Sequence, residues 1–117
     1  MHSGDAVPLK PLGTRMSDAL VEMSSKGFGC VGIVDASGQI AGIVTDGDLR
    51  RHMRPDLMTA LVDEVMTRNP KTIGRDLLAS EALEILNSSK ITALIVTDAN
   101  KPVGIVHLHD LLRAGVA

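Results

Sequence analysis

The second half of this chain repeats the first half, and no other feature of the sequence constrains the fold as strongly. The segment Gly42–Arg51 (GIVTDGDLRR) returns as Gly104–Arg113 (GIVHLHDLLR), so the Gly-Ile-Val start, the Asp-Leu pair and the closing Arg are all kept. Further matches lie upstream in the two halves: Ala19 with Ala82, Leu20 with Leu83, Ser25 with Ser88, and Asp35 with Asp98. The repeat predicts two copies of one supersecondary unit that fill nearly the whole chain.

The length of 117 residues leaves about 55 residues for each copy, which is marginal for an independent domain. We therefore expect the two units to pack on each other. Hydrophobic residues make up 44% of the chain and charged residues 22%, which is typical of a globular protein. No apolar run approaches the roughly 18 residues that span a bilayer, and residues 1–20 contain no signal peptide. The sequence predicts a soluble, cytoplasmic protein with no membrane partner.

Charge and aromatic content argue against nucleic acid as a partner. The formal net charge is -2, and nearby carboxylates balance the basic cluster of Arg50, Arg51 and Arg54. This cluster is either a solvated helix face or a means of steering a phosphorylated ligand. The chain has no Trp, no Tyr and a single Phe, so it offers no aromatic platform for stacked bases. Cys30 is the only cysteine, which rules out an internal disulfide and fits a reducing compartment.

Both halves show the same order of predicted elements. Apolar residues recur at helical spacing, which predicts an amphipathic helix in each half. Two short apolar runs separated by a turn follow each helix and predict a β-hairpin, and a short helix closes each unit. An extended segment precedes each first helix. In the first unit these elements are 7–10, 16–23, 30–34, 40–44 and a helix from near Asp48; in the second they are 70–73, 79–86, 93–96, 103–106 and 110–114.

The expected division of the chain follows from this order. The first unit is predicted to span residues 1–56 and the second unit residues 67–117. Residues 57–66 are compatible with a helix and are predicted to form a connector helix between them.

The segment Thr45-Asp46-Gly47-Asp48 places polar groups where a predicted strand passes into a helix. A threonine hydroxyl and backbone N–H groups at a helix start suit a phosphate, and a nearby carboxylate suits a ribose diol. The same residues would also serve simply to cap the helix that begins near Asp48. A nucleotide site and a helix cap are both open interpretations.

The order helix, strand, turn, strand, Gly-Ile-Val-Thr-x-x-Asp, helix, present twice, resembles a tandem pair of CBS domains, also called a Bateman module. The resemblance covers essentially the whole chain. It implies an α+β fold of two βαββα units related by pseudo-two-fold symmetry, with the sheets packed together and the helices outside. It also implies two clefts for adenosyl or other nucleotide ligands, and a homodimer formed through the helices.

The resemblance also implies a set of ligand-binding residues. In this family the Ser/Thr-x-x-Asp motif contacts phosphate and ribose, which carries over to Thr45 and Asp48, with Gly47 between them. The second unit keeps Asp110 but has His107 in place of the hydroxyl residue, so its cleft is empty, binds something else, or uses the imidazole on an anionic group. By position, the first cleft is completed by Pro8, Leu9, Lys10, Gly29 and Cys30, and the second by Lys71, Thr72, Thr92 and Ala93.

A narrower resemblance lies in the segments Gly42–Arg51, 65–73 and 83–92. They are similar to the C-terminal CBS pair of bacterial arabinose 5-phosphate isomerases, which interconvert ribulose 5-phosphate and arabinose 5-phosphate on the route to the lipopolysaccharide sugar Kdo. The isomerase domain of these enzymes is N-terminal and cannot fit in a chain already filled by the repeat. Met1 stands where Met66 stands before the second unit, which fits excision from a longer protein and equally a native start.

This resemblance implies a regulatory piece without catalytic residues, whose partner is the sugar-isomerase domain. The family points to AMP or ATP as the ligand, and the pathway points to the end product CMP-Kdo. The alternative is a structural module for self-association with vestigial clefts.

Two further groups of residues invite a chemical interpretation. His107, His109 and Asp110 lie close together in sequence but are too few for a zinc site, so we expect no metal. Cys30 lies in an apolar run, which is more typical of a small core residue than of a nucleophile. No Ser/His/Asp arrangement or acid/base pair of carboxylates stands out, so no catalytic residue is predicted.

Overall fold

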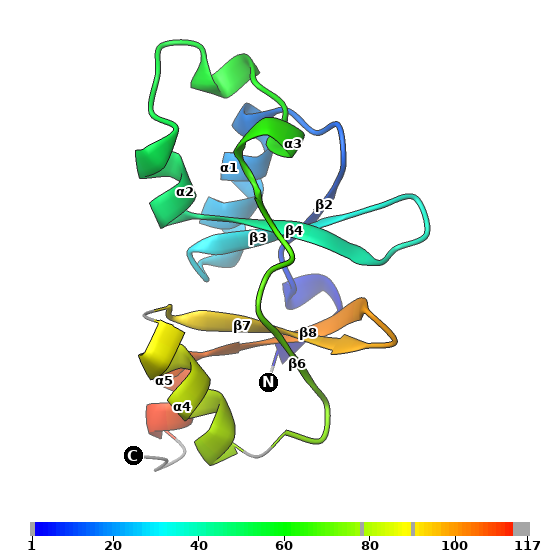
Figure 1. Ribbon diagram of the computed structural model, residues 1–117, viewed down its shortest axis with the longest axis vertical. Coiled ribbons are helices and arrows are strands. Elements are labelled where there is room, and N and C mark those ends of the chain that lie inside the picture. Colours follow the sequence, from blue (N-terminus) through cyan, green and yellow to red (C-terminus); the bar gives the residue numbers. More distant parts are fainter. Residues whose placement is uncertain (1, 78, 90, 114–117) are drawn as a thin grey trace. The chain divides into compact units, whose positions relative to one another are not determined.

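The computed structural model describes residues 2–77, 79–89 and 91–113 (Figure 1). The chain divides into two compact units. The first unit is Pro8–Pro70, and the second combines the described residues up to Val7 with those from Lys71 onward. No helix within the described ranges is long and apolar enough to cross a membrane.

The first unit is built on a four-stranded sheet with the order β2-β3-β4-β5. Strand β2 runs parallel to β3, whereas the β3–β4 hairpin and the β4–β5 pair are antiparallel. The elements of this unit are β2 (Leu9–Pro11), α1 (Met16–Lys26), β3 (Cys30–Val34), β4 (Ile40–Thr45), α2 (Asp46–Arg51), η2 (Leu57–Thr59), α3 (Val62–Val65) and β5 (Thr67–Arg68).

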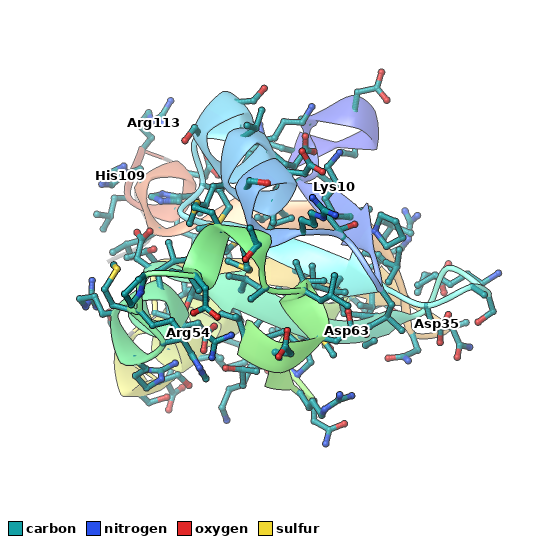
Figure 2. All side chains as sticks on the ribbon, turned by 90° about the horizontal axis from the view of Figure 1, so that it is seen from above. Lys10, Asp35, Arg54, Asp63, His109 and Arg113 are labelled. Atoms are coloured by element: carbon teal, nitrogen blue, oxygen red, sulfur yellow. The ribbon has the colours of Figure 1, made fainter. Side chains whose placement is uncertain are left out.

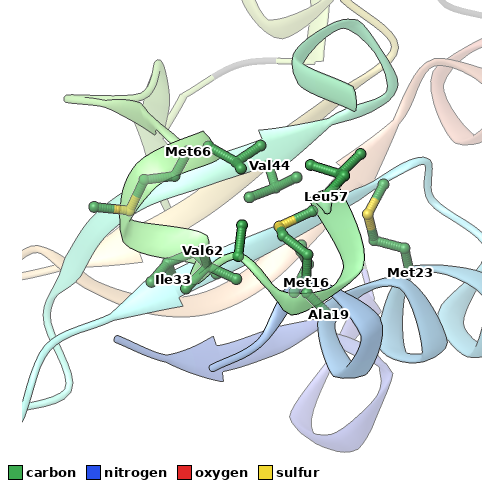
Figure 3. Packing of buried hydrophobic residues seen from close by; sticks show 11 residues of the cluster. Met16, Ala19, Met23, Ile33, Val44, Leu57, Val62 and Met66 are labelled. Carbon is green, nitrogen blue, oxygen red and sulfur yellow. The ribbon is translucent and has the colours of Figure 1, made fainter. Parts of the chain in front are cut away.

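Helix α1 buries the apolar stripe that its sequence predicts. Met16, Ala19 and Met23 lie on the face that packs into the core, together with Ile33 of β3 and Val44 of β4 (Figure 3). The helix ends at Gly27, whose φ of 78° lies in the left-handed region that glycine enters without steric cost. These buried side chains fix the sheet against the helix and so hold the end of β4 in place.

A polar turn joins β3 to β4. The carboxylate of Asp35 accepts hydrogen bonds from the backbone N–H groups of Ser37 (2.9 Å) and Gln39 (3.0 Å), and Gly38 adopts a φ of 83°. Figure 2 shows Asp35 at the tip of this hairpin. The turn confirms the predicted hairpin and fixes the register that places Cys30 opposite Thr45.

The second unit repeats this plan with the sheet order β1-β8-β7-β6. Strand β6 runs parallel to β7, and the β7–β8 and β1–β8 pairs are antiparallel. A core cluster that includes Leu86, Leu94 and Val96 packs the helices on the sheet. The elements are β1 (His2–Ser3), η1 (Gly4–Ala6), β6 (Thr72–Gly74), α4 (Ala79–Ser89), β7 (Ala93–Asp98), β8 (Lys101–His107) and α5 (Leu108–Arg113).

The observed units differ from the predicted boundaries at the N-terminus. Strand β1 pairs with β8, with His2 opposite Ile105 and Ser3 opposite Gly104, and Val7 is buried. The described residues before Pro8 therefore belong to the second unit, because strand β1 pairs with β8 of that unit. The predicted final helix is observed as α5, and Ala114 lies outside the described residues.

The predicted connector helix over 57–66 is also different in the structure. It is interrupted at Ala60 and Leu61, which have extended backbone angles. The N–H of Met16 donates to the carbonyl of Ala60 at 2.8 Å, and the N–H of Val62 donates to the carbonyl of Thr14 at 2.8 Å. These bonds to the start of α1 take the place of helical ones, so the segment forms the two short pieces η2 and α3 instead.

Candidate functional site: the strand–helix junctions

The end of β4 and the start of α2 form a reciprocal cap in the first unit. Thr45 is the N-cap of α2, and its side-chain hydroxyl accepts from the backbone N–H of Asp48 at 3.3 Å. In return, the Asp48 carboxylate oxygen Oδ2 accepts from the backbone N–H of Thr45 at 2.9 Å. The capping interpretation of this segment is confirmed, and the cap fixes the positions of the threonine hydroxyl and the carboxylate.

The second carboxylate oxygen of Asp48, Oδ1, is held by two further side chains. Arg51 donates to it from Nη2 at 2.6 Å, and the hydroxyl of Thr67 on β5 donates at 2.7 Å. Asp48 is 2% exposed, whereas the side chain of Arg51 is 63% exposed. The carboxylate is therefore buried, whereas Arg51 and Thr67, which both donate to Oδ1, are exposed residues.

These partners decide the charge of Asp48. Burial alone would raise the pKa of the Asp48 carboxyl, but hydrogen bonds from Thr67, from the Thr45 backbone and from Arg51 outweigh it and lower the pKa below the ordinary value of 3.8. The group is thus an anion at neutral pH.

Several other predicted residues of the first cleft lie beside this junction. Cys30 is opposite Thr45 in the β3–β4 register. A Cβ at Gly29 would lie 3.4 Å from a carboxylate oxygen of Asp46, and one at Gly47 would lie 3.2 Å from the Arg51 guanidinium. The absence of side chains at both glycines therefore leaves room close to charged groups.

The entering strand lies on the other side of β3. Leu9 is opposite Gly32, Lys10 is opposite Ile33, and the carbonyl of Pro8 accepts from the N–H of Gly32 at 2.9 Å. These residues flank the middle of β3 rather than its beginning at Cys30. They are neighbours of the strand that positions the junction, but the register does not place them at the junction itself.

The second unit has a corresponding junction between β8 and α5. The backbone N–H of His107 donates to the Asp110 carboxylate oxygen Oδ2 at 3.0 Å, as Thr45 does to Asp48. The imidazole of His107 takes over from the hydroxyl and accepts from the backbone N–H of His109 at 3.1 Å. The other oxygen of Asp110, Oδ1, lies 3.1 Å from Nε2 of His2 on β1 and 3.8 Å from Nη2 of Arg113.

As in the first cleft, some of the remaining predicted residues of the second cleft lie at the junction and others lie away from it. Ala93 is opposite His107 in the β7–β8 register, and the carbonyl of Thr92 accepts from the N–H of Leu108 at 2.7 Å, so both lie at the junction. Thr72 is opposite Ile95 farther along the sheet, and Lys71 precedes it as an exposed residue.

Opposing effects act on the pKa of His107 at the second junction. Burial and the nearby His109 lower the pKa of His107, against the attraction of the Asp110 carboxylate. The two imidazole rings are 4.6 Å apart and tilted by 56°. Figure 2 shows His109 and Arg113 on α5, where both are exposed. Among the residues that the structure describes, no group of three His, Cys, Asp or Glu side chains is arranged to hold a metal ion.

Three side chains that hold the two carboxylates could not be assigned this role from the sequence. Thr67 and His2 belong to strands of two residues, which periodicity does not detect, and Arg51 was seen only as part of a basic cluster. The signal was present in the repeat, because Met1-His2 and Met66-Thr67 stand at matching places before the two units. These two residues make equivalent contacts: His2 contacts Asp110, and Thr67 contacts Asp48.

The fold and the two junctions define a class of protein, the tandem modules in which a small α+β unit occurs twice with a capped carboxylate after its last strand. The sequence profile described as CBS domain matches residues 6–55 and 62–117. The chain therefore belongs to the CBS domain family, and the tandem pair that the repeat implied is confirmed. It is a module of the regulatory type.

The curated relatives of this chain include arabinose 5-phosphate isomerases. The enzyme KdsD of Pseudomonas aeruginosa is 48% identical over 119 residues, covering 99% of this chain and 36% of the relative. KdsD of Yersinia pestis is 44% identical over 118 residues, again covering 99% of this chain and 36% of the relative. The chain thus spans about a third of the length of the curated relatives it matches.

Solved structures of CBS proteins share the fold. CBSX2 in complex with AMP has a TM-score of 0.83 and 23% identity, covering 98% of this chain and 91% of that one. The CBS domain pair of protein MJ0100, in complex with 5′-methylthioadenosine and S-adenosyl-L-methionine, has a TM-score of 0.81 and 24% identity, covering 93% and 87%. These likenesses show the α+β fold of a CBS pair.

Proposed function

We propose that this chain is the ligand-sensing regulatory pair of an arabinose 5-phosphate isomerase, in the pathway to Kdo. Its ligand is a nucleotide or nucleotide sugar, with AMP, ATP and CMP-Kdo as the candidates. The observation that carries the proposal is the fixed Thr45–Asp48 cap, an anionic carboxylate beside a hydroxyl at the end of a strand. Two proteins of the same fold carry adenosyl ligands in their solved structures, which supports this ligand class.

The contacts of Asp48 suggest how a ribose would bind. Each carboxylate oxygen accepts two hydrogen bonds from the protein: Oδ2 from the backbone N–H and, at 3.1 Å, the hydroxyl of Thr45, and Oδ1 from Arg51 and Thr67. A diol therefore has to replace one of the present donors. Arg51 is the donor whose side chain is mostly exposed, and water can solvate its guanidinium when it leaves. A released Arg51 is then available to a phosphate, which suits a ligand with both groups.

Regulation by this module requires two packings with different affinities for the ligand. Binding shifts the population toward the packing with the higher affinity, and an attached isomerase domain responds to that shift. The isomerase domain is thus the proposed partner, in a cytoplasmic homodimer of the kind that the family resemblance implies.

Calorimetric titration with AMP, ATP, CMP and CMP-Kdo tests this proposal. We expect saturable binding of at least one compound, and a loss of binding in Asp48→Asn, which keeps the size of the side chain but removes its charge. The matched control is Asp35→Asn, the same change in the exposed hairpin turn, which should bind as the unmodified chain does. Absence of binding by every compound, or equal binding by Asp48→Asn, contradicts the proposal.

A second candidate function is self-association of the parent enzyme with vestigial clefts. It is favoured by large apolar side chains exposed on helices: Val21 on α1 is 68% exposed and Leu112 on α5 is 52% exposed. Light scattering over a range of concentrations tests it, with Val21→Glu as the variant and Glu22→Gln as a control on the same helix. A dimer that Val21→Glu dissociates, in a chain that binds none of the four compounds, would favour this function.

A further inference from the structure

Gly47 lies in the first turn of α2, where the backbone gives no reason for a glycine. Its φ lies outside the left-handed region, whereas Gly29 has a φ of 74°. Glycine is also among the poorest helix formers, so another residue at position 47 would favour α2. What the glycine provides at this position must therefore be sought in the side chains around it.

The space beside Gly47 is occupied by the guanidinium of Arg51. The two residues are four apart in α2 and so share one face of the helix. A Cβ at position 47 would lie 3.2 Å from Nη1 and 3.7 Å from Nη2 of Arg51. The first distance is tighter than ordinary van der Waals contact, and Nη2 is the atom that donates to Asp48. A side chain at position 47 would therefore push the guanidinium away from the carboxylate.

The second unit provides a comparison, because it has a side chain at the equivalent position. In the repeat, His109 is aligned with Gly47. Arg113 is aligned with Arg51, but its Nη2 lies 3.8 Å from Oδ1 of Asp110, which is too far for a hydrogen bond. The corresponding distance in the first unit is 2.6 Å. The arginine reaches its carboxylate only in the unit that has the glycine.

We infer that Gly47 and Arg51 form an autoinhibitory latch over Asp48. Gly47 leaves the space in which the guanidinium reaches Oδ1, and the latched guanidinium occupies the carboxylate that a ribose diol needs. The inference rests on the proposed function for the role of Asp48 in binding. It adds that a side chain of this chain competes with the ligand, and that Gly47 is a positioning residue that sets the affinity of the first cleft.

Arg51 is the donor best suited to open and close in this way. The backbone N–H of Thr45 is fixed at the end of a strand, and Thr67 belongs to β5, where it is opposite Ile43 of β4. Arg51 reaches Oδ1 through a long side chain that is 63% exposed, so it can leave without any movement of the backbone. Water solvates the released guanidinium, which keeps the cost of opening small.

The latch itself can be tested without a ligand. NMR spectra of the arginine side chains report the rotation of each guanidinium about its Cζ–N bonds, and the signals of Arg51 are assigned by their loss in Arg51→Met. We expect this rotation to be about twofold to fivefold slower in the unmodified chain than in Gly47→Ala, as for an ion pair at a protein surface. Gly74→Ala is the matched control, because its Cβ would meet no atom within 4 Å, and it should leave the rotation unchanged. Equal rates in the unmodified chain and Gly47→Ala would contradict the latch.

Calorimetric titration tests the competition with the ligand. The probes are two matched pairs, adenosine with AMP and cytidine with CMP. Gly47→Ala should bind both members of the responsive pair about twofold to fivefold more tightly than the unmodified chain does, because no latch has to open. Arg51→Met should also bind the nucleoside more tightly, but it should lose the preference for the nucleotide, because the guanidinium is no longer available to the phosphate.

The double variant separates the latch from a direct effect of the added methyl group on the ligand. In the Arg51→Met background, Gly47→Ala should leave nucleoside binding unchanged, and circular dichroism verifies that each variant is folded. Weaker or unchanged nucleoside binding in Gly47→Ala, or an effect of the same size with and without Arg51, would overturn the inference. Absence of binding by every variant contradicts the proposed function, whereas the NMR comparison decides separately whether the latch forms.

Discussion

Asp48 combines two roles that are usually assigned to different residues. Its carboxylate completes the cap of α2 and also joins α2 to β5 through Thr67. The same carboxylate is the group that the proposed function assigns to a ribose. A substitution chosen to remove ligand binding therefore also removes structure, which is why the binding test uses the isosteric Asp48→Asn.

We expect Asp48→Ala to lower the free energy of unfolding by about 2–3 kcal/mol, because it removes a cap and a buried charged acceptor. Asp46→Ala, in the same first turn but exposed, should cost less than about 1 kcal/mol. Urea denaturation of both variants provides the comparison. The lowered pKa means that the stabilisation by Asp48 is present above the ordinary carboxyl range and is lost as the pH falls through the lowered pKa. Equal costs for the two variants would contradict the role given to Asp48.

Cys30 should be unreactive in the folded chain. Burial, followed by the negative charge of Asp46, raises the pKa of its thiol to about 12. At pH 8 roughly one molecule in ten thousand then carries the reactive thiolate, and the side chain is buried as well. We expect a thiol reagent to modify the native chain at least a hundred times more slowly than the chain in urea. Rapid labelling without denaturant would show that β3 opens readily.

Among the elements, the close antiparallel pairing of β4 with β5 depends on a glycine. A Cβ at Gly42 would lie 2.6 Å from Sδ of Met66 and 2.9 Å from the backbone carbonyl oxygen of Thr67. The flexible methionine can move, but the carbonyl belongs to the paired strand and cannot move without breaking the sheet. The close approach of the two backbones is therefore a requirement of the fold.

Gly42→Ala should destabilise the first unit by about 1–3 kcal/mol through overpacking. The matched control is Gly74→Ala, also in a strand, where a Cβ would meet no atom within 4 Å. Thermal unfolding should show a clearly lower midpoint for Gly42→Ala and little change for Gly74→Ala. Similar midpoints for the two variants would mean that β5 is displaced at little cost.

Periodicity and turn chemistry are sufficient to predict the long elements of this chain. Helix α1 and the β3–β4 hairpin follow from an apolar stripe and from the turn at Asp35, which are local features. Strands β1 and β5 could not be predicted in this way, because two residues contain no period and their pairing depends on partners far away in the sequence. The break at Ala60 has the same origin, since hydrogen bonds to Thr14 and Met16 override a helical pattern.

The candidate site shows the same division. Thr45 and Asp48 follow from the motif and the resemblance, and the structure confirms that they form a cap. The contacts of Thr67, Arg51 and His2 depend on tertiary structure, and only the repeat could have pointed to two of them. The roles of Thr45 and Asp48 in binding a ligand stay predictions.

For the molecule as a whole, the two units differ in whether they are continuous in sequence. The first unit is one continuous segment, Pro8–Pro70, whereas the second needs the residues up to Val7 as well as those from Lys71 onward. A fragment of residues 8–70 therefore contains every strand of its sheet. A fragment of residues 71–113 lacks β1 and the buried Val7.

We expect the fragment 8–70 to unfold cooperatively, with low stability that suits its size. The fragment 71–113 should be largely unfolded, and joining residues 1–7 to it through a flexible linker should restore structure. Circular dichroism with thermal unfolding distinguishes these states. A cooperative transition in 71–113 alone would show that β1 is dispensable.

The pairing of β1 with β8 also orders events during protein synthesis. At about 5–20 residues per second, the ribosome needs roughly 5–20 s to pass from His2 to its partner Ile105. Throughout that interval β1 has no partner strand, while the neighbouring segment Pro8–Pro70 emerges complete and can fold. Strand β1 is thus made before the rest of the pair but is among the last of its parts to find its place, and the second unit closes only when translation of the repeat is nearly finished.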